Sequence, residues 1–261
     1  MDLTGRTALV TGANRGIGKA ILGALAEQPL DLLLAGVRDP GKFEQPTATR
    51  AKEVRPVALD LSSRESIEEG VTGLDGVPVD LLVNNAGLVT GGLLEEQELD
   101  DIYAMLQVNL LGVIQLTRSL LPGMLGRGRG KVVNNASISG YAYFPAASTY
   151  AASKAGVVAF TESLRRETRG TGVSCLHLVT GGVDTDMLDE TQDTYGKHLD
   201  TSGWDSVPAE EWAAKVVAAI ENDDDVLGPG GKTSIAKLAS RGPAFLLDFL
   251  SGRSFSRAPK Y

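Results

Sequence analysis

Short continuous runs of apolar residues alternate along the chain with longer segments whose apolar residues are spaced as on a helix. Such runs are typical of strands that are buried on both faces of a parallel sheet. They predict strands at 6–12, 30–36, 55–60, 79–87, 131–137 and 173–179. The segments between them predict helices near 16–28, 64–73, 96–125, 148–169 and 208–222. We therefore expect an α/β fold in which helices cover both faces of a mainly parallel sheet.

No proline-rich or low-complexity linker interrupts this alternation, so we expect residues 1–261 to form one domain. The tripeptide NNA occurs at 84–86 and at 134–136, and we interpret it as two strand ends of similar chemistry. Residues 186–207 are rich in Thr, Asp and Gly, and we expect them to form a mobile lid over a substrate. Residues 233–261 form a C-terminal extension. We expect it to end in a short helix docked on its own domain or on a sister subunit, and contact with a membrane surface is the alternative.

The composition argues against several classes of partner. The chain has 33 acidic and 25 basic residues, a net charge of −8 and no long run of Lys or Arg, so we expect no nucleic-acid partner. Cys175 is the only cysteine, and His177 and His198 are the only histidines, so we expect no disulfide within the chain and no metal site. The N-terminus lacks the pattern of a signal peptide, and polar residues interrupt the apolar region at 105–125. We expect a cytoplasmic protein with no membrane partner.

A glycine-rich sequence, TGANRGIG at 11–18, follows the first predicted strand and opens the first predicted helix. Glycine allows a tight turn and a close approach of the backbone to a phosphate, and the helix N-terminus offers N–H groups and positive potential. The spacing of Gly12, Gly16 and Gly18 is G-x-x-x-G-x-G instead of the G-x-G-x-x-G of most dinucleotide folds. A plain tight turn is the alternative, but the position after the first strand favours an anion-binding loop.

Tyr150 and Lys154, in YAASK, are four residues apart, so on a helix the phenol and the ammonium lie over one another. The ammonium would then stabilise the phenolate and lower the pKa of the tyrosine from its ordinary value of about 10. A tyrosine with a lowered pKa suits proton transfer. The same spacing also occurs by chance on solvated helix faces, so the pair needs support from the rest of the chain.

These motifs resemble those of the short-chain dehydrogenase/reductase family, and the resemblance covers nearly the whole chain. It depends on TGANRGIG, Asp60 after the third strand, NNAG at 84–87, Asn109 in VNLLG, Ser137 in ASISG and YAASK, in the family's order and spacing. It implies a doubly wound Rossmann fold with about seven strands and hydride transfer at a nicotinamide. Ser137 lies thirteen residues before Tyr150, as in the family, so we take it and not Ser139 as the candidate.

The resemblance implies catalytic roles for Asn109, Ser137, Tyr150 and Lys154. Tyr150 would exchange a proton with the substrate oxygen, while Lys154 would lower the pKa of that tyrosine and hydrogen-bond the nicotinamide ribose. Ser137 would hold the substrate oxygen, and Asn109 would support a chain of water from Lys154 to solvent. Taken singly, Ser137 could cap a turn and Asn109 could be a buried amide that satisfies backbone groups.

The implied cofactor is NADP(H), with NAD(H) as the alternative. An enzyme that uses NAD usually ends its second strand with an acid, whereas Gly36 stands here, followed by Arg38, and Arg15 adds a second cation. Both arginines could instead be solvated surface charges. Thr180-Gly181 replaces the family's usual Pro-Gly and loses the fixed φ of proline. The cofactor-binding residues that the resemblance implies are Gly12, Asn14, Arg15, Gly16, Ile17, Gly18, Arg38, Asp60, Leu61, Asn85, Ala86, Gly87, Tyr150, Lys154, Val183 and Thr185.

We expect an oxidoreductase, similar to carbonyl reductases, that transfers a hydride between NADP(H) and an apolar ketone, aldehyde or secondary alcohol. An apolar substrate wall is predicted, although core packing explains its members equally well; they are Leu88, Leu93, Leu94, Tyr141, Tyr143 and Phe144. The alternatives are an NAD-dependent dehydrogenase of a sugar or polyol and a non-catalytic regulator that senses the dinucleotide. Family members are commonly homodimers or homotetramers, and we expect the same here.

Overall fold

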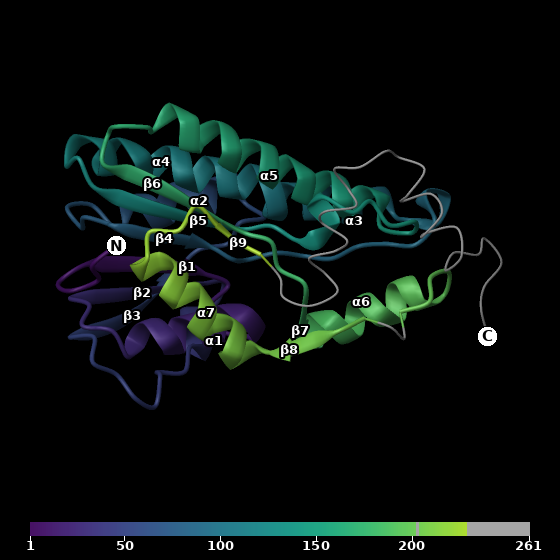
Figure 1. Cartoon of the computed structure of the whole chain (residues 1–261), viewed down its shortest axis with the longest axis horizontal. Coiled ribbons are helices and arrows are strands. Elements are labelled where there is room, and N and C mark those ends of the chain that lie inside the picture. Colours follow the sequence, from purple (N-terminus) through teal and green to yellow (C-terminus); the bar gives the residue numbers. More distant parts are fainter. Residues whose placement is uncertain (202–203, 229–261) are drawn as a thin grey trace.

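The computed structural model describes residues 1–201 and 204–228, and its strands and helices alternate as the sequence predicts (Figure 1). The main sheet contains β1 Thr7–Thr11, β2 Leu32–Val37, β3 Glu53–Ala58, β4 Leu81–Asn84, β5 Gly130–Asn135, β6 Val173–Leu178 and β9 Val226–Leu227. The helices are α1 Gly16–Ala26, α2 Arg64–Thr72, α3 Leu99–Leu106, α4 Gly112–Gly126, α5 Ser148–Glu167, α6 Asp186–Gly196 and α7 Ala209–Glu221.

The strands of the main sheet are parallel and follow the order β3-β2-β1-β4-β5-β6-β9. The chain moves outward from β1 to β3, returns to the centre, and then moves outward in the other direction from β4. The loops after β1 and β4 therefore lead away from each other and open a crevice at the carboxyl ends of these strands, where ligands bind in folds of this kind. The prediction of a doubly wound, mainly parallel sheet of about seven strands is confirmed.

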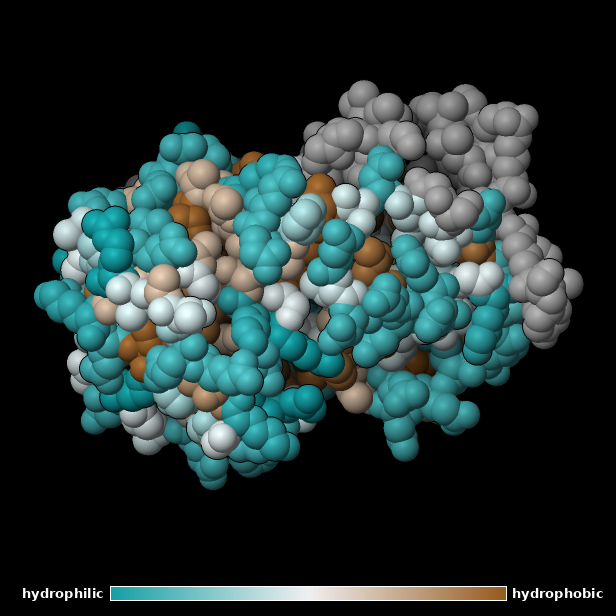
Figure 2. Space-filling model, turned by 90° about the horizontal axis from the view of Figure 1, so that it is seen from below, coloured by the Kyte–Doolittle hydropathy of each residue, from teal (hydrophilic) through white to brown (hydrophobic). Residues whose placement is uncertain are grey.

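Helices cover both faces of this sheet, as predicted (Figure 1). On one face α1 and α7 pack side by side and bury Ile21 and Ile220 in a shared core. On the other face α2, α4 and α5 bury Ile67, Leu116 and Leu164. A fully buried Leu or Ile contributes about 1.5–3 kcal/mol of transfer free energy, so these two cores hold the layers together. Figure 2 shows the side of α1 and α7, where the surface is mostly hydrophilic and its hydrophobic patches are small.

Several strands end earlier than the sequence predicts, and the differences at β4 and β5 bear on the crevice. β4 ends at Asn84 and β5 ends at Asn135, in place of the predicted ends at 87 and 137. The backbone N–H of Asn85 donates to the Thr11 hydroxyl, at 3.0 Å, instead of continuing the strand ladder. The residues that follow each strand thus lie in loops at the carboxyl edge of the sheet.

The predicted helix at 96–125 begins later, at Leu99, and has an irregular centre. Gln107–Leu111 form a π-helical segment that joins α3 to α4. Such a segment inserts one extra residue into a helical turn and is frequent at functional sites. Asn109 lies at its centre, is 1% exposed and contacts the loop that follows β4.

A helix that the sequence did not predict, α6, occupies part of the expected lid. It lies beyond the carboxyl end of the main sheet, beside a small sheet of β7 Gly182–Asp184 and β8 Ser206–Pro208 (Figure 1). Tyr195 and Leu199 are 2% and 3% exposed and pack with Ala146 and Ala147 in a separate apolar cluster. Movement of this segment as a lid stays a prediction, and the extension at 233–261 lies outside the described residues.

The two NNA tripeptides pair with each other across β4 and β5. Asn84 and Asn134 are register partners, and the Asn84 amide donates to Asn134 Oδ1 at 2.8 Å. Asn134 Nδ2 then donates to the Thr161 hydroxyl of α5 at 2.9 Å. This buried chain lies on the face of the sheet that α4 and α5 cover. Because side chains alternate along a strand, Asn135 is directed away from it.

We predict that Asn134→Ala destabilises the fold without altering the crevice. The alanine removes a partner from the buried Asn84 amide, so the free energy of unfolding should fall by about 1–3 kcal/mol. Urea denaturation followed by circular dichroism measures this change. Asn222→Ala, at the exposed end of α7, is the control and should change it by less than about 0.5 kcal/mol. Equal losses in the two variants would contradict the prediction.

Candidate active site

A cavity of about 440 Å³ occupies the crevice at the carboxyl ends of the strands. Three of the four predicted catalytic residues, Ser137, Tyr150 and Lys154, line it, and Asn109 contacts the loop at its edge. Every other residue implied for cofactor binding lines it as well: Gly12, Asn14, Arg15, Gly16, Ile17, Gly18, Arg38, Asp60, Leu61, Asn85, Ala86, Gly87, Val183 and Thr185. The fold therefore brings the predicted positions together from loops that are far apart in the chain.

The glycine loop requires glycine at each of its three positions. Gly12 and Gly16 have φ of +66° and +50°, in the left-handed region that favours glycine. A Cβ at Gly18 would overlap the carbonyl of Gly12, because the first turn of α1 packs directly on the loop. Among the described residues, no side chain caps α1 at Arg15. The first N–H groups of α1 thus remain for a ligand, and the helix dipole favours an anion there.

Two arginines flank the glycine loop without an acidic partner. Arg15 and Arg38 are exposed, and neither forms a salt bridge with any residue that the structure describes. The Asp39 side chain accepts a hydrogen bond from the Gly41 N–H and so caps the short turn that follows it. At the end of β2, Gly36 is buried, and a Cβ there would already lie 3.1 Å from Leu59 Cδ2. This strand end therefore has little room for an acid that would repel a 2′-phosphate.

The segment after β6 closes over the glycine loop. Thr185 stands at the start of α6, and its hydroxyl donates to Val183 O at 3.2 Å. A Cβ at Gly16 would lie 3.4 Å from Thr185 Cγ2, so the two loops nearly touch. Thr180, at the start of this segment, is 6% exposed, and its carbonyl accepts the Ile138 N–H at 2.9 Å. The turn is thus held by hydrogen bonds where the family usually has a proline.

Tyr150 and Lys154 lie on successive turns of α5, as their spacing predicts, with Lys154 Nζ 5.7 Å from the centroid of the phenol ring. The expected lowering of the tyrosine pKa is wrong, however. Burial at the bottom of the cavity raises the pKa of Tyr150 to about 12, and a hydrogen bond with the Ser137 side chain offsets only part of that rise. The Lys154 ammonium lies over the ring but donates to the carbonyl oxygen of Asn135, 3.0 Å away, and its charge does not offset the effect of burial on the phenol. At neutral pH Tyr150 is therefore protonated.

Lys154 is 5% exposed, and burial lowers the pKa of its ammonium to about 8. It is charged at neutral pH and loses its proton in mildly alkaline solution. Gly87 lies beside it. A Cβ on that glycine would lie 3.2 Å from Asn109 Oδ1 and 3.6 Å from Lys154 Nζ. The absence of a side chain therefore lets an amide oxygen and an ammonium approach the same stretch of backbone.

Ser137 begins the short turn Ile138–Gly140 in an extended conformation, and its Oγ accepts the Ser139 N–H at 3.1 Å. The reading of Ser137 as a turn cap is therefore confirmed. In this hydrogen bond the Ser137 Oγ is only the acceptor. The hydroxyl proton remains for the Tyr150 phenol, whose pKa the Ser137 side chain lowers. Backbone bonds to Leu178, the last residue of β6, and to Thr180 fix the residues on both sides of Ser137. Its hydroxyl is thus held rigidly beside the phenol.

Asn109 clamps the loop that follows β4. Its Nδ2 donates to Leu88 O at 2.8 Å and its Oδ1 accepts the Leu88 N–H at 2.7 Å, so the side chain pairs with both backbone groups of one residue. Nδ2 also donates to the Ser153 hydroxyl of α5 at 3.1 Å. The reading of Asn109 as a buried amide that satisfies backbone groups is confirmed. Its role in a water chain stays a prediction.

The apolar end of the cavity differs from the predicted wall. Of the six predicted members, Leu88 and Phe144 line the described cavity, whereas Leu93, Leu94, Tyr141 and Tyr143 do not. Tyr141 instead stacks on His177, with ring centroids 5.7 Å apart. Tyr143 and Leu94 are 63% and 62% exposed. Proximity in the sequence grouped aromatic residues that the turn after β5 sends in different directions.

The rest of the apolar end comes from α6 and the residues that follow it, which sequence reasoning missed. Met187, Leu188 and Tyr195 line the cavity from α6, and Trp204 lines it from beyond that helix. The Trp204 ring centroid lies 6.3 Å from that of Tyr195 and 6.2 Å from that of Phe144. The Tyr195 hydroxyl donates to Thr90 O at 3.1 Å and holds α6 against the loop after β4. Three aromatic rings therefore enclose this end.

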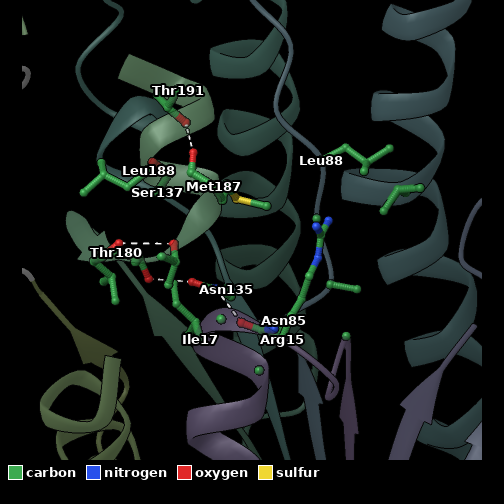
Figure 3. A pocket seen from close by; sticks show the side chains of 18 of the residues that line it. Arg15, Ile17, Asn85, Leu88, Asn135, Ser137, Thr180, Met187, Leu188 and Thr191 are labelled. Atoms are coloured by element: carbon green, nitrogen blue, oxygen red, sulfur yellow. Dashed lines mark hydrogen bonds between the residues drawn. The ribbon is translucent and has the colours of Figure 1, made fainter. Parts of the chain in front are cut away.

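A row of hydrogen bonds crosses the floor of the cavity (Figure 3). Thr180 Oγ1 donates to Asn135 Oδ1 at 2.5 Å, and Asn135 Nδ2 donates to Asn85 Oδ1 at 3.0 Å. Asn85 Nδ2 then donates to Thr11 O at 3.3 Å. These residues lie at the ends of β6, β5, β4 and β1, which are neighbours in that order. Sequence reasoning did not place Asn135 or Thr180 among the site residues, and the repeated NNA was the signal that could have found Asn135.

Comparison with known families agrees with this geometry. A model of the family described as short chain dehydrogenase matches residues 6–196. The ketoacyl reductase HetN of Nostoc sp. is 34% identical over 229 residues, which are 84% of this chain and 77% of the relative. The 3-oxoacyl-(acyl-carrier-protein) reductase FabG of Vibrio cholerae is 34% identical over 196 residues, which are 74% of this chain and 80% of the relative.

Solved structures share the whole architecture. A short chain dehydrogenase from Burkholderia cenocepacia, in complex with NADP, superposes with a TM-score of 0.81 at 26% identity and covers 96% of this chain and 99% of its own. An alcohol dehydrogenase from Thermococcus sibiricus, complexed with 5-hydroxy-NADP, has a TM-score of 0.71 at 27% identity and covers 86% of this chain and 95% of its own. The fold is thus shared with proteins whose structures were solved in complex with NADP or an NADP derivative.

We predict that Gly91→Ala disturbs the aromatic end of the cavity. A Cβ at Gly91 would overlap the Tyr195 ring, so the ring must move relative to Trp204. The free energy of unfolding should fall by about 1–3 kcal/mol, and the tryptophan emission spectrum should shift. Gly196→Ala is the control, because a Cβ at that position of α6 meets nothing within 4 Å. Unchanged emission in Gly91→Ala would show that the ring does not fill this space.

Proposed function

The chain belongs to the short-chain dehydrogenase family, and we propose that it is an NADP(H)-dependent oxidoreductase that interconverts apolar ketones or aldehydes and their alcohols. The observation that carries this proposal is that Ser137, Tyr150 and Lys154 line one cavity with the glycine loop. A regulator that only bound the dinucleotide would need no proton donor at this place. An NAD-dependent dehydrogenase of a sugar or polyol is a weaker alternative, because the aromatic end of the cavity offers few partners for several hydroxyl groups.

The residues at the polar end of the cavity fit NADP(H). The uncapped first turn of α1 and the turns at Gly12 and Gly16 suit a pyrophosphate. Arg15 and Arg38 offer two cations for a 2′-phosphate, and Gly36 leaves no acid to repel it. The NADP complex of the Burkholderia cenocepacia protein supports the same assignment. When bound, the cofactor supplies or accepts the hydride.

Tyr150 is the proton donor in the proposed reduction. Burial keeps its phenol protonated at neutral pH, since its pKa is raised to about 12. A carbonyl oxygen placed against the Tyr150 and Ser137 hydroxyls would accept a hydrogen bond from each and take the Tyr150 proton as negative charge develops on it. Ser137 contributes a donor of fixed position, because its Oγ is already anchored by the Ser139 N–H.

In this mechanism Lys154 and Asn109 act after Tyr150 has given up its proton: Lys154 stabilises the phenolate, and both residues help to replace the proton. The Lys154 ammonium is charged below about pH 8 and lies 5.7 Å from the centroid of the Tyr150 ring, so it stabilises the phenolate that remains. Its other N–H groups can hydrogen-bond the nicotinamide ribose. Lys154 Nζ and Asn109 Oδ1 both lie beside Gly87, and a water bound between these two polar groups would return a proton from solvent.

The substrate in this proposal is a compact apolar carbonyl compound. Phe144, Tyr195 and Trp204 form an enclosure that suits an apolar body beside the reacting oxygen. Asp186 also lines the cavity and is exposed, so it repels anionic substrates. Reduction of a 3-oxoacyl thioester is a second candidate, favoured by the names of two relatives at 34% identity. Because Asp186 would repel an anionic carrier, the thioester is the less favourable of the two candidates.

We predict that Tyr150→Phe abolishes turnover but not cofactor binding. Loss of the proton donor should lower kcat by about 10²–10⁴-fold, while the Kd for NADPH, measured by nicotinamide fluorescence, should change by less than about threefold. Turnover is followed as NADPH absorbance decay with a panel of apolar ketones and aldehydes, a sugar and a 3-oxoacyl thioester. Tyr143→Phe is the control, because that tyrosine is 63% exposed and outside the cavity.

Each alternative has its own signature in the same experiment. Tight NADPH binding by the wild type without turnover of any compound in the panel would favour the regulator. Turnover limited to the thioester would favour the second candidate. Substantial activity retained by Tyr150→Phe would remove Tyr150 from the mechanism.

We predict that Arg38→Ala weakens NADPH binding by about 10–100-fold, which is the loss expected for a charged hydrogen bond to a phosphate. The Kd for NADH should change by less than about threefold, because NADH has no 2′-phosphate. Fluorescence titration with both nucleotides measures the two constants. Arg64→Ala is the control, since that exposed arginine pairs with Glu68 on α2. An equal effect on NADPH and NADH would overturn the role of Arg38 in selectivity.

A further inference from the structure

The row of hydrogen bonds under the cavity runs in one direction. The Thr180 hydroxyl donates to Asn135, the Asn135 amide donates to Asn85, and the Asn85 amide donates to the carbonyl of Thr11. Thr180, Asn135 and Thr11 are 6%, 9% and 1% exposed, so water competes little for these groups. Hydrogen bonds in series polarise one another, and each member depends on its neighbours for its geometry.

Asn135 is the centre of this row, and it also carries the acceptor of the catalytic lysine. Its side chain is tied to Thr180 on one side and to Asn85 on the other, while its backbone carbonyl accepts the Lys154 ammonium at 3.0 Å. The peptide unit that contains this carbonyl is also held by its own N–H, because Ala136 N–H donates to Leu178 O at 3.0 Å. The residue that binds the Lys154 ammonium is therefore held by one backbone and two side-chain hydrogen bonds.

We propose that Asn135 is a positioning residue which, through Thr180 and Asn85, fixes the carbonyl that holds Lys154 and the spacing of the loops around the cofactor. This inference rests on the proposed oxidoreductase function for its effect on turnover. Its effects on Lys154 and on nucleotide binding concern the chain's own residues. The Thr180 hydroxyl is the first donor of the row, so its removal leaves Asn135 Oδ1 buried without this donor and frees the amide to rotate.

Release of the Asn135 carbonyl has a defined electrostatic consequence. Tyr150 is the ionisable side chain that faces Lys154 in the described part of the chain. Burial alone accounts for the lowered pKa of Lys154, with no charged neighbour among these residues contributing. Loss of the carbonyl acceptor removes a group that favours the ammonium, so the pKa of Lys154 falls further. Activity that needs the charged lysine is then lost at lower pH.

The neighbouring residue provides a matched control. Asn134 has the same amide, belongs to the same strand and is fully buried, but its hydrogen bonds go to Asn84 and Thr161 on the opposite face of the sheet. Asn134→Ala therefore removes a buried side-chain amide and leaves the hydrogen bonds of Thr180, Asn135 and Asn85 in place. An effect that came from general loosening of β5 would appear in both variants.

The experiment compares Thr180→Val, Thr180→Ser and Asn135→Ala with Asn134→Ala and the wild type. The pKa of Lys154 is measured without cofactor, from the pH dependence of its labelling by acetic anhydride, read by mass spectrometry. The Kd for NADPH is measured by nicotinamide fluorescence, and kcat is measured against pH with the best carbonyl substrate. These three quantities separate a positioning role from loss of stability.

We expect Thr180→Val and Asn135→Ala to lower the pKa of Lys154, to move the alkaline loss of kcat to lower pH, and to raise the Kd for NADPH by up to about tenfold, the worth of one hydrogen bond. Thr180→Ser keeps the hydroxyl and should restore all three quantities. Asn134→Ala should leave them at the wild-type values.

An unchanged Lys154 pKa and an unchanged Kd in Thr180→Val would overturn the inference, as would equal changes in Thr180→Ser. If Asn135→Ala does not fold, the two Thr180 variants decide the question alone. If the wild type reduces no carbonyl in the panel, the proposed function fails. The labelling and binding measurements then still accept or reject the role of Asn135.

Discussion

The buried ammonium of Lys154 needs an acceptor within hydrogen-bond distance, because a charge with little access to water is costly unless it is bound. The carbonyl at the end of β5 supplies that acceptor. This contact requires β5 to stop at Asn135 and α5 to pass beside its end. The ammonium also lies over the ring of Tyr150, but burial is the larger effect and raises the pKa of the phenol. The protonation of the site thus depends on where one strand ends and on what fixes its last peptide.

The sheet and the glycine loop could be predicted because their signals are local. Apolar runs indicate buried strands wherever they occur, and the positive φ of Gly12 and Gly16 leaves a visible mark in the sequence. The end of β4 could not be located, because the Thr11 hydroxyl competes with the ladder for the Asn85 N–H from far along the chain. Helix α6 was missed for the same reason. Its buried residues pack on Ala146 and Ala147, a contact that no local pattern records.

The sequence predicted which residues form the site better than it predicted how their side chains are oriented. The spacing of Tyr150 and Lys154 establishes that they are close, but the direction of a long flexible side chain depends on its acceptor, which is a backbone atom of another element. The pKa of Tyr150 rises because the phenol is buried, and the spacing of the two residues does not reveal that burial. The repeated NNA shows the same limit. Its two strand ends were recognised, whereas their division between the core at Asn134 and the cavity at Asn135 follows only from the register of β4 and β5.

The two pKa values favour one direction of reaction in the proposed function. Between neutral pH and about 8, Lys154 is charged and Tyr150 is protonated, which is the state that donates a proton to a carbonyl oxygen. Oxidation of an alcohol begins instead from the phenolate, and forming it costs free energy in proportion to the gap between its pKa and the pH. An alkoxide is a far stronger base than a phenolate, so a reduced carbonyl takes the Tyr150 proton readily. We infer that this protonation state suits reduction, and that the hydrogen bonds of Thr180, Asn135 and Asn85 sustain it by holding the carbonyl that binds the Lys154 ammonium.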